Sequence, residues 1–213
     1  MTRQEFYKNV LMWAEKRNVI KGSTPERQTI KLGEEFGELC AGVSRGDLAL
    51  IKDSVGDCMV VVTILRAMVG ATDTLEDEPL GAQLPFGDDI KRSATLIVTR
   101  RMGEIAQCIF LNANELVTLA TLRAFYQELE ALCSAYNIDI TECYETAWND
   151  IKDRKGLIVD GVYMKQADIE KKLAELDSRL NELAALDDNV SVEADALALE
   201  AALWQDRLVA CMK

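Results

Sequence analysis

The sequence predicts an all-α protein, an antiparallel helical bundle followed by a C-terminal helical hairpin. Apolar residues recur at intervals of three and four over most of the 213 residues, whereas the strict alternation of a half-buried strand is almost absent. Hydrophobic residues make up 49% of the chain, which is enough to fill a core, and 12 glycines and 3 prolines are too few for a linker-dominated chain. Together these observations favour helices packed on helices.

Eight helices are expected, and several have a clear start. Asp47, Asn114 and Asp139 are suited to cap N-termini, because their side-chain oxygens can accept hydrogen bonds from free backbone amides. In the segment GLIVDGVY, the pair Asp160-Gly161 predicts a tight hairpin corner. The expected helices cover residues 3–18, 24–45, 47–69, 89–112, 115–136, 139–154, 166–186 and 191–212.

The chain is expected to divide into a bundle, residues 1–163, and an amphipathic hairpin, residues 164–213. One apolar stripe of the hairpin has leucines at intervals of three and four, which must bury against another surface: Leu173, Leu176, Leu180 and Leu183. Within the bundle, residues 71–89 hold six acids and no base. A loop of this length is expected to be a connector between two helical halves or, alternatively, a substrate lid.

A weak internal repeat relates residues 24–69 to residues 89–136. A shift of 66 residues places Glu35 on Arg101, so the acidic character is not repeated. The pattern indicates either a decayed duplication or the chance agreement that any two bundle helices can show. The matching apolar positions are Leu32, Phe36, Leu39 and Val43 with Val98, Met102, Ile105 and Ile109.

Composition excludes several classes of function. The chain has no histidine, so Ser-His-Asp catalysis and histidine-ligated zinc or copper are impossible. With 36 acidic against 24 basic residues the net charge is −12, which disfavours a nucleic-acid partner. The six cysteines form no CxxC pair, as expected of reduced, buried thiols. No signal peptide or bilayer-spanning apolar run is found, so no membrane partner and a cytoplasmic location are expected, in the host cytoplasm if a phage encodes the chain.

Four carboxylates on two neighbouring predicted helices carry the strongest functional signal. Glu35 and Glu38 lie along the edge of one apolar face, and Asp53 and Asp57 lie on the apolar side of the next helix. Antiparallel packing would bring the two pairs opposite each other, where like charges repel. Protonation, basic partners or a divalent cation must compensate, and all-oxygen ligands select Mg²⁺, Mn²⁺ or Ca²⁺. Gly56 leaves room beside this group for a backbone, an ion or a phosphate.

The same segment of the sequence resembles a known family. The motif EEFGEL, with Asp57 following eighteen residues after Leu39, resembles the EExxE, spacer, ExxD pattern of the MazG-like all-α nucleoside triphosphate pyrophosphatases. Gln28 and Lys31 fit the QxxKxxEE form of that superfamily, and DSVGD and AWNDIKDRKG are most similar to its phage branch. The resemblance covers about residues 1–163 and leaves the C-terminal hairpin unexplained.

The resemblance implies a fold of the all-α pyrophosphatase type and a reaction, the Mg²⁺-dependent hydrolysis of a nucleoside triphosphate to the monophosphate and pyrophosphate. Mn²⁺ is a possible substitute metal. Glu35, Glu38 and Asp57 would be metal ligands, and Glu35 or Glu38 would activate water. Ser54 stands where the family has the Glu of ExxD, so Asp53, one residue earlier, is the expected fourth ligand.

Substrate contacts are expected from Gln28 and Lys31 and from a cluster at the end of the sixth helix, namely Asn149, Lys152, Arg154 and Lys155. Such a basic helix end could instead only complement the helix dipole. Trp13, Tyr144 and Trp148 are candidates for base stacking or for the core. A homo-oligomer, dimer or tetramer, is expected. The alternatives are a dUTPase-like or dCTPase-like hydrolase and a helical interaction protein that binds nucleotides without turnover.

Overall fold

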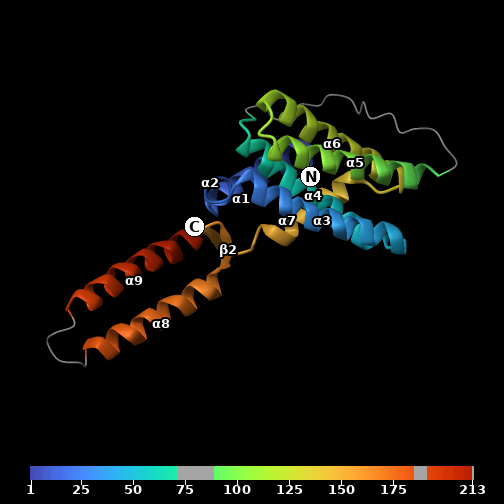
Figure 1. The fold of residues 1–213 in the computed structure, drawn as a ribbon. Coiled ribbons are helices and arrows are strands. Elements are labelled where there is room, and N and C mark those ends of the chain that lie inside the picture. Colours follow the sequence, from blue (N-terminus) through green and yellow to red (C-terminus); the bar gives the residue numbers. More distant parts are fainter. Residues whose placement is uncertain (72–88, 185–190, 213) are drawn as a thin grey trace.

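The computed structural model describes residues 1–71, 89–184 and 191–212, and these residues are mostly helical with one small two-stranded sheet (Figure 1). This agrees with the predicted all-α class. The elements, in chain order, are α1 (Arg3–Lys16), α2 (Val19–Gly22), α3 (Pro25–Arg45), α4 (Leu48–Met68), α5 (Ile90–Phe110), α6 (Glu115–Ala135), α7 (Ile140–Ile151), β1 (Gly156–Val159), β2 (Val162–Lys165), α8 (Gln166–Ala184) and α9 (Ser191–Cys211).

The predicted caps are confirmed. The Asp47 side chain accepts from the amides of Ala49 and Leu50 at 3.1 Å, and Asn114 and Asp139 each accept at 2.9 Å from the amide two residues on. Each cap satisfies donors that the first helical turn leaves free.

The first helix is shorter than predicted. The expected helix over residues 3–18 ends at Lys16, because Asn18 adopts the left-handed conformation with φ 54°. The Asn18 side chain also donates to the Ile158 carbonyl at 3.1 Å, which ties this break to β1. The short helix α2, which was not predicted, follows directly and turns the chain toward α3.

Helix α4 lies at the centre of the bundle. It is apolar around most of its circumference, and it packs against α1, α3, α6 and α7. A helix that is hydrophobic on all sides must be surrounded by other elements. As a consequence, any acid on α4 is forced into a low-polarity environment, and this applies to Asp53 and Asp57.

The strands β1 and β2 form an antiparallel hairpin with a tight turn at Asp160-Gly161. Both turn residues have positive φ, 50° and 79°, as the predicted type of hairpin corner requires. The two faces of the hairpin have different neighbours. Ile158 belongs to the core of the bundle, whereas Leu157 and Val159 belong to a second, smaller core.

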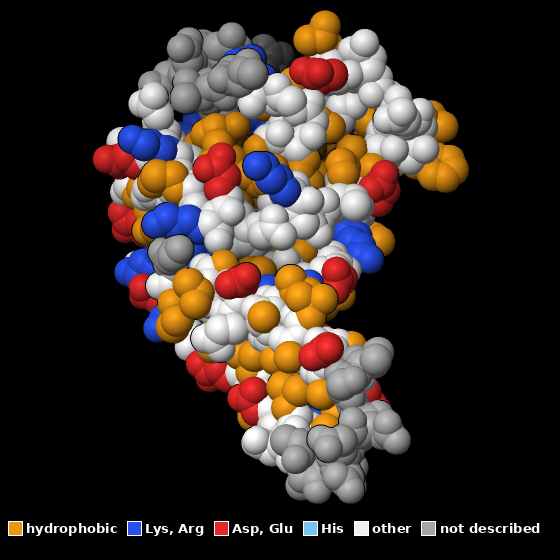
Figure 2. Space-filling view, turned by 90° about the vertical axis from the view of Figure 1, so that its left-hand side faces the viewer, with side chains coloured by type: hydrophobic (Ala, Val, Ile, Leu, Met, Phe, Trp, Pro, Cys, Tyr) orange, Lys and Arg blue, Asp and Glu red, His pale blue; other side chains and the backbone are white. Residues whose placement is uncertain are grey.

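Helices α8 and α9 form an arm that projects from the bundle (Figure 1). Its predicted leucine stripe is confirmed, since Leu173 and Leu176 are buried and Leu180 and Leu183 pack against them. Apolar side chains follow the arm over much of its length in Figure 2. The boundary predicted between residues 163 and 164 falls inside β2, because the hairpin contributes to both cores.

The helix pairs α3–α4 and α5–α6 are the two candidate repeats. The matched positions have matched burial: Leu32 and Leu39 are fully buried, and so are Val98 and Ile105. The segment between the pairs, residues 72–88, lies outside the described residues, so the expectations for the acidic loop stay predictions.

None of the helices in the described part of the chain is both long enough and apolar enough to cross a membrane.

Candidate functional site

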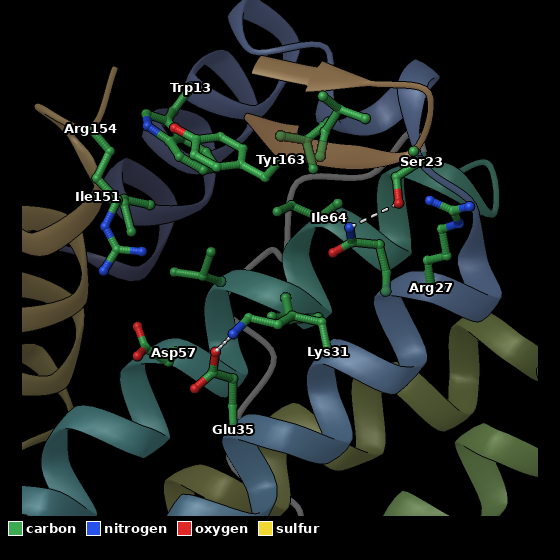
Figure 3. A pocket seen from close by; sticks show the side chains of 16 residues that line it. Trp13, Ser23, Arg27, Lys31, Glu35, Asp57, Ile64, Ile151, Arg154 and Tyr163 are labelled. Atoms are coloured by element: carbon green, nitrogen blue, oxygen red, sulfur yellow. Dashed lines mark hydrogen bonds and ion pairs between the residues drawn. The ribbon is translucent and has the colours of Figure 1, made fainter. Parts of the chain in front are cut away.

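A cavity of about 390 Å³ opens between α1, α3, α4, α7 and the β-hairpin (Figure 3). Its size lies within the range of small-molecule pockets. Five of the ten predicted site residues line it, and the remaining lining is largely apolar. These five residues are Gln28, Lys31, Glu35, Asp57 and Arg154.

The acidic end of the pocket holds two carboxylates from neighbouring helices. Glu35 on α3 and Asp57 on α4 face each other across the pocket floor in Figure 3. Glu35 is only 7% exposed, and its carboxylate forms an ion pair with the Lys31 ammonium at 2.7 Å. Asp57 forms no ion pair with another described residue, so the site carries more negative than positive charge at its floor.

Asp57 is the most perturbed acid of this site. Burial raises its pKa from 3.8 to about 7, and the negative charges of Glu35 and Asp53 add to the increase. The Arg154 guanidinium opposes the shift only in part. A carboxyl group in this condition gains stability from any added proton or cation, and perturbed acids in clefts are characteristic of functional sites.

Asp53 lies beside the pocket without lining it. Burial raises its pKa, and the charges of Asp150 and Glu35 raise it further. Asp150, on α7, was missed by sequence reasoning, although it lies in the quoted motif AWNDIKDRKG and precedes Arg154 by four residues. Ser54 is fully buried, and its hydroxyl has no hydrogen-bond partner among the described residues. Asp53, rather than Ser54, therefore faces the acidic group.

Gly56 serves helix packing. A Cβ atom at this position would lie 2.5 Å from the Cys143 carbonyl oxygen and 2.8 Å from the Ala147 Cβ. The sequence left open whether a backbone, an ion or a phosphate approaches Gly56, and the close neighbour is the backbone of α7. This close approach of α7 to α4 carries Arg154 to the pocket.

The cations of the pocket come from α3 and from the chain after α7. Arg154 is held by Arg17, whose Nε donates to the Arg154 carbonyl at 2.7 Å. The Arg17 guanidinium also lies 5.2 Å from the centre of the Trp13 ring, which lines the pocket. Arg27, not predicted from the sequence, lies opposite Arg154 at the β-hairpin turn, with its Nη1 3.5 Å from the Asp160 carbonyl.

The other predicted residues do not line this pocket. Glu38 is exposed on α3, and Lys155 is exposed after α7. Asn149 and Lys152 bond to each other at 2.6 Å on the surface. Their substrate and metal roles remain predictions without support from the geometry.

The aromatic candidates separate clearly. Tyr144 is buried and stacks on Phe6 with ring centroids 4.8 Å apart, and Trp148 packs against the core. Trp13 lines the pocket, together with Tyr163 from the β-hairpin. Tyr163 could not be assigned from the sequence, since its position depends on the hairpin folding back over α1 and α4.

The carboxylates of the pocket are the candidate ligands of a metal ion. Across the described ranges, no three Asp, Glu or Cys side chains stand close enough together to hold an ion as they are placed. The chemistry of the donors nevertheless fits a hard cation, because Glu35, Asp53 and Asp57 offer carboxylate oxygens only. The unrelieved charge at Asp57 is the observation that favours a bound cation.

Comparison with known proteins gives a phage relative. The chain is 56% identical over 73 residues to an uncharacterized 18.2 kDa protein from the rep-hol intergenic region of Haemophilus phage HP1 (strain HP1c1). The match covers 34% of this chain and 45% of that protein, so the chain matches about half of the relative's length. No family model matches the chain, and no solved structure matches it either.

Proposed function

We propose that the protein is a Mg²⁺-dependent nucleoside triphosphate pyrophosphohydrolase of the MazG-like all-α type. It would cleave ribo- or deoxyribonucleoside triphosphates to the monophosphate and pyrophosphate, for control or cleansing of the nucleotide pool. The observation that carries the proposal is the pocket itself, in which Glu35 and Asp57 face each other between cations on two sides. The phage relative agrees with the phage-type motifs and with action in a host cytoplasm.

The charges of the pocket suit a polyphosphate. Lys31 and Arg154 can contact phosphate oxygens from two sides, and Val60, Val61 and Ile64 of α4 supply an apolar wall for the nucleoside. An acidic floor alone would repel a triphosphate. Mg²⁺ held by Glu35 and Asp57, with Asp53 beside them, would neutralise this repulsion and orient the phosphates.

Glu35 is the residue best placed to move the proton. Its carboxylate is buried and is oriented by Lys31, so it can accept a proton from an attacking water. The water oxygen forms a bond to the α-phosphorus, the bond between this phosphorus and the bridging oxygen to the β-phosphate breaks, and pyrophosphate leaves with the electron pair. Lys31 and Arg154 stabilise the charge that develops on the phosphates.

A narrower hydrolase of the dUTPase or dCTPase kind would use the same residues. The alternative from another class is a nucleotide-binding helical protein without turnover. Two observations favour this alternative: Glu38 lies off the pocket, and Ser54 replaces the motif acid. Turnover separates it from the proposal.

The test is pyrophosphate release across the ribo- and deoxyribonucleoside triphosphates, with and without Mg²⁺. The wild-type chain should release pyrophosphate only with the metal. Glu35→Gln should lower kcat by roughly a hundredfold or more, as loss of a general base does. Glu175→Gln is the matched control, because Glu175 also pairs with a lysine four residues earlier, at 3.9 Å, but on the exposed arm.

Two results would overturn the proposal. One is turnover in Glu35→Gln equal to that of Glu175→Gln, which would place the chemistry elsewhere. The other is tight nucleotide binding by the wild type without pyrophosphate release under any metal, which would favour the binding protein.

A further inference from the structure

We propose that Gln28 reads the edge of the nucleotide base and that Ser23 fixes the Gln28 side chain for this task. The inference rests on the proposed function and adds an orientation for the substrate. The base would lie on the side of the pocket formed by Ser23 and Gln28, and the triphosphate would extend past Glu35 and Asp57 toward Arg154.

The Gln28 amide is buried and has one partner. It is 8% exposed, it lines the pocket, and its Nε2 donates to the Ser23 hydroxyl at 3.2 Å. The nitrogen and oxygen of a side-chain amide point in opposite directions, so this bond turns Oε1 away from Ser23. Among the described residues no donor reaches Oε1. The pocket therefore presents a fixed acceptor that lacks a protein partner.

The spacing along α3 fits a nucleoside. Gln28, Lys31 and Glu35 lie on one face of the helix, and a rise of about 1.5 Å per residue places the Cα atoms of Gln28 and Glu35 about 10 Å apart along the helix axis. This is the order of distance between a base edge and the α-phosphorus. Lys31 lies between the two, where it can reach the phosphates.

The two sides of the pocket differ in chemistry. In Figure 3, Ser23 and Arg27 lie on one side, Arg154 lies on the opposite side, and Glu35 and Asp57 lie between and below them. The surface between the two sides is apolar, with Ile64 at its centre. A flat base can rest on this surface while its edge meets the Gln28 oxygen.

A fixed acceptor selects for a base with an N–H group at that edge. A base without the N–H would cover this oxygen and leave it unpaired, and an acceptor that is buried on binding without a partner costs more than one hydrogen bond contributes. Because the base is remote from the reacting phosphorus, the contact is made equally before and during reaction. Its loss should therefore raise KM and leave kcat unchanged.

The experiment compares nucleotides that differ by one N–H. Uridine carries an N–H at its pairing edge and zebularine does not, and inosine and purine riboside form the same contrast among purines. For at least one pair, the wild type should prefer the N–H-bearing triphosphate by roughly tenfold in KM, the effect of one lost hydrogen bond. The corresponding monophosphates, measured by calorimetry, should show the same preference without turnover.

Variants locate the effect. Gln28→Leu removes the acceptor and should abolish the preference. Ser23→Ala leaves the acceptor in place but frees the amide to rotate, so the preference should shrink. Ser23→Thr keeps the hydroxyl and should retain the preference that Ser23→Ala loses. Circular dichroism checks that each variant is folded.

The outcomes separate this inference from the proposed function. If no nucleoside triphosphate binds or is cleaved, the proposed function fails. If other nucleoside triphosphates are cleaved but neither member of either pair binds or reacts, the function stands and the inference about Gln28 fails. If both members of both pairs bind and react equally well in the wild type, the function stands and Gln28 does not read the base. A preference that survives Ser23→Ala and Gln28→Leu unchanged would also overturn the inference.

Discussion

At the scale of single residues, Asp57 has the most strongly raised pKa among the acids of the site. Its pKa of about 7 means that, between about pH 4 and pH 7, the folded chain holds a proton that the unfolded chain has released. Stability therefore falls as the pH rises through this window. At pH 8 the folded protein carries the full penalty of a buried, unpaired carboxylate.

Asp57→Asn should remove this penalty. We expect the variant to be more stable than the wild type at pH 8 by at least about 1 kcal/mol, because each unit of pKa shift corresponds to about 1.4 kcal/mol. At pH 4 the two proteins should differ much less. Urea unfolding at the two pH values, without divalent metal, measures both differences. A variant that is less stable than the wild type at pH 8 would show that Asp57 is compensated within the protein.

Asp53 and Ser54 offer a second test at this scale. The Asp53 carboxyl faces the acidic group, whereas Ser54 is buried in the core. Asp53→Asn should therefore lower the apparent Mg²⁺ affinity and the turnover rate by roughly tenfold or more, the effect typical of lost support at a metal site. Ser54→Ala should leave both nearly unchanged. Mg²⁺ titrations of activity on the two variants give the comparison. A larger loss from Ser54→Ala would reverse the assignment.

At the scale of helices, the two candidate repeats differ in charge where they pack. In α3–α4 the carboxylates of Glu35 and Asp57 face each other, whereas in α5–α6 the guanidinium of Arg101 pairs with Glu128 at 2.7 Å. Glu128 is 6% exposed, so this second ion pair is largely buried. One helix pair is left with uncompensated charge, and the other is neutralised internally.

Breaking the second pair should be costly. Arg101→Ala leaves the buried Glu128 with only the more distant Arg100, at 3.6 Å, and should lower the free energy of unfolding by about 1–3 kcal/mol. The double variant Arg101→Met with Glu128→Leu should recover most of that loss. Arg179→Ala, which breaks an exposed 3.3 Å pair on the arm, should cost less than about 1 kcal/mol. Urea unfolding compares them, and equal losses in the single and double variants would contradict the buried-charge explanation.

The helices were predictable because their signals are local. Apolar periodicity and the caps at Asp47, Asn114 and Asp139 located most helix ends to within one to three residues. The break at Asn18 was missed, since it depends on a left-handed residue bonded to a strand 140 residues away. The site was half predictable: Glu35 and Asp57 follow from helical spacing on adjacent helices. Arg27 and Tyr163 do not, because only tertiary packing brings the β-hairpin over the pocket.

At the scale of the whole molecule, the bundle presents apolar side chains at the turn between α5 and α6. Phe110 is 85% exposed and Leu116 is 74% exposed, with Leu111 and Val117 next to them. Clustered exposed apolar side chains are typical of association surfaces. They are consistent with the homo-oligomer that the sequence suggested, which stays a prediction.

We expect the protein to sediment as a dimer or tetramer at micromolar concentration. Replacing both Phe110 and Leu116 with Asp should lower the mass of the assembly, because it places charge in a surface that would otherwise be buried. Analytical ultracentrifugation measures both proteins. A wild type that remains monomeric at every concentration would contradict the expectation.

The central claim is that the Glu35–Asp57 pocket directs water to the α-phosphorus of a nucleoside triphosphate. Hydrolysis in water enriched in heavy oxygen tests it most directly, because mass spectrometry shows which product carries the label. With Mg²⁺, the label should appear in the nucleoside monophosphate and be absent from pyrophosphate, and Asp57→Asn should suppress its incorporation. Label in pyrophosphate or in inorganic phosphate, or equal incorporation in the variant, would contradict the account.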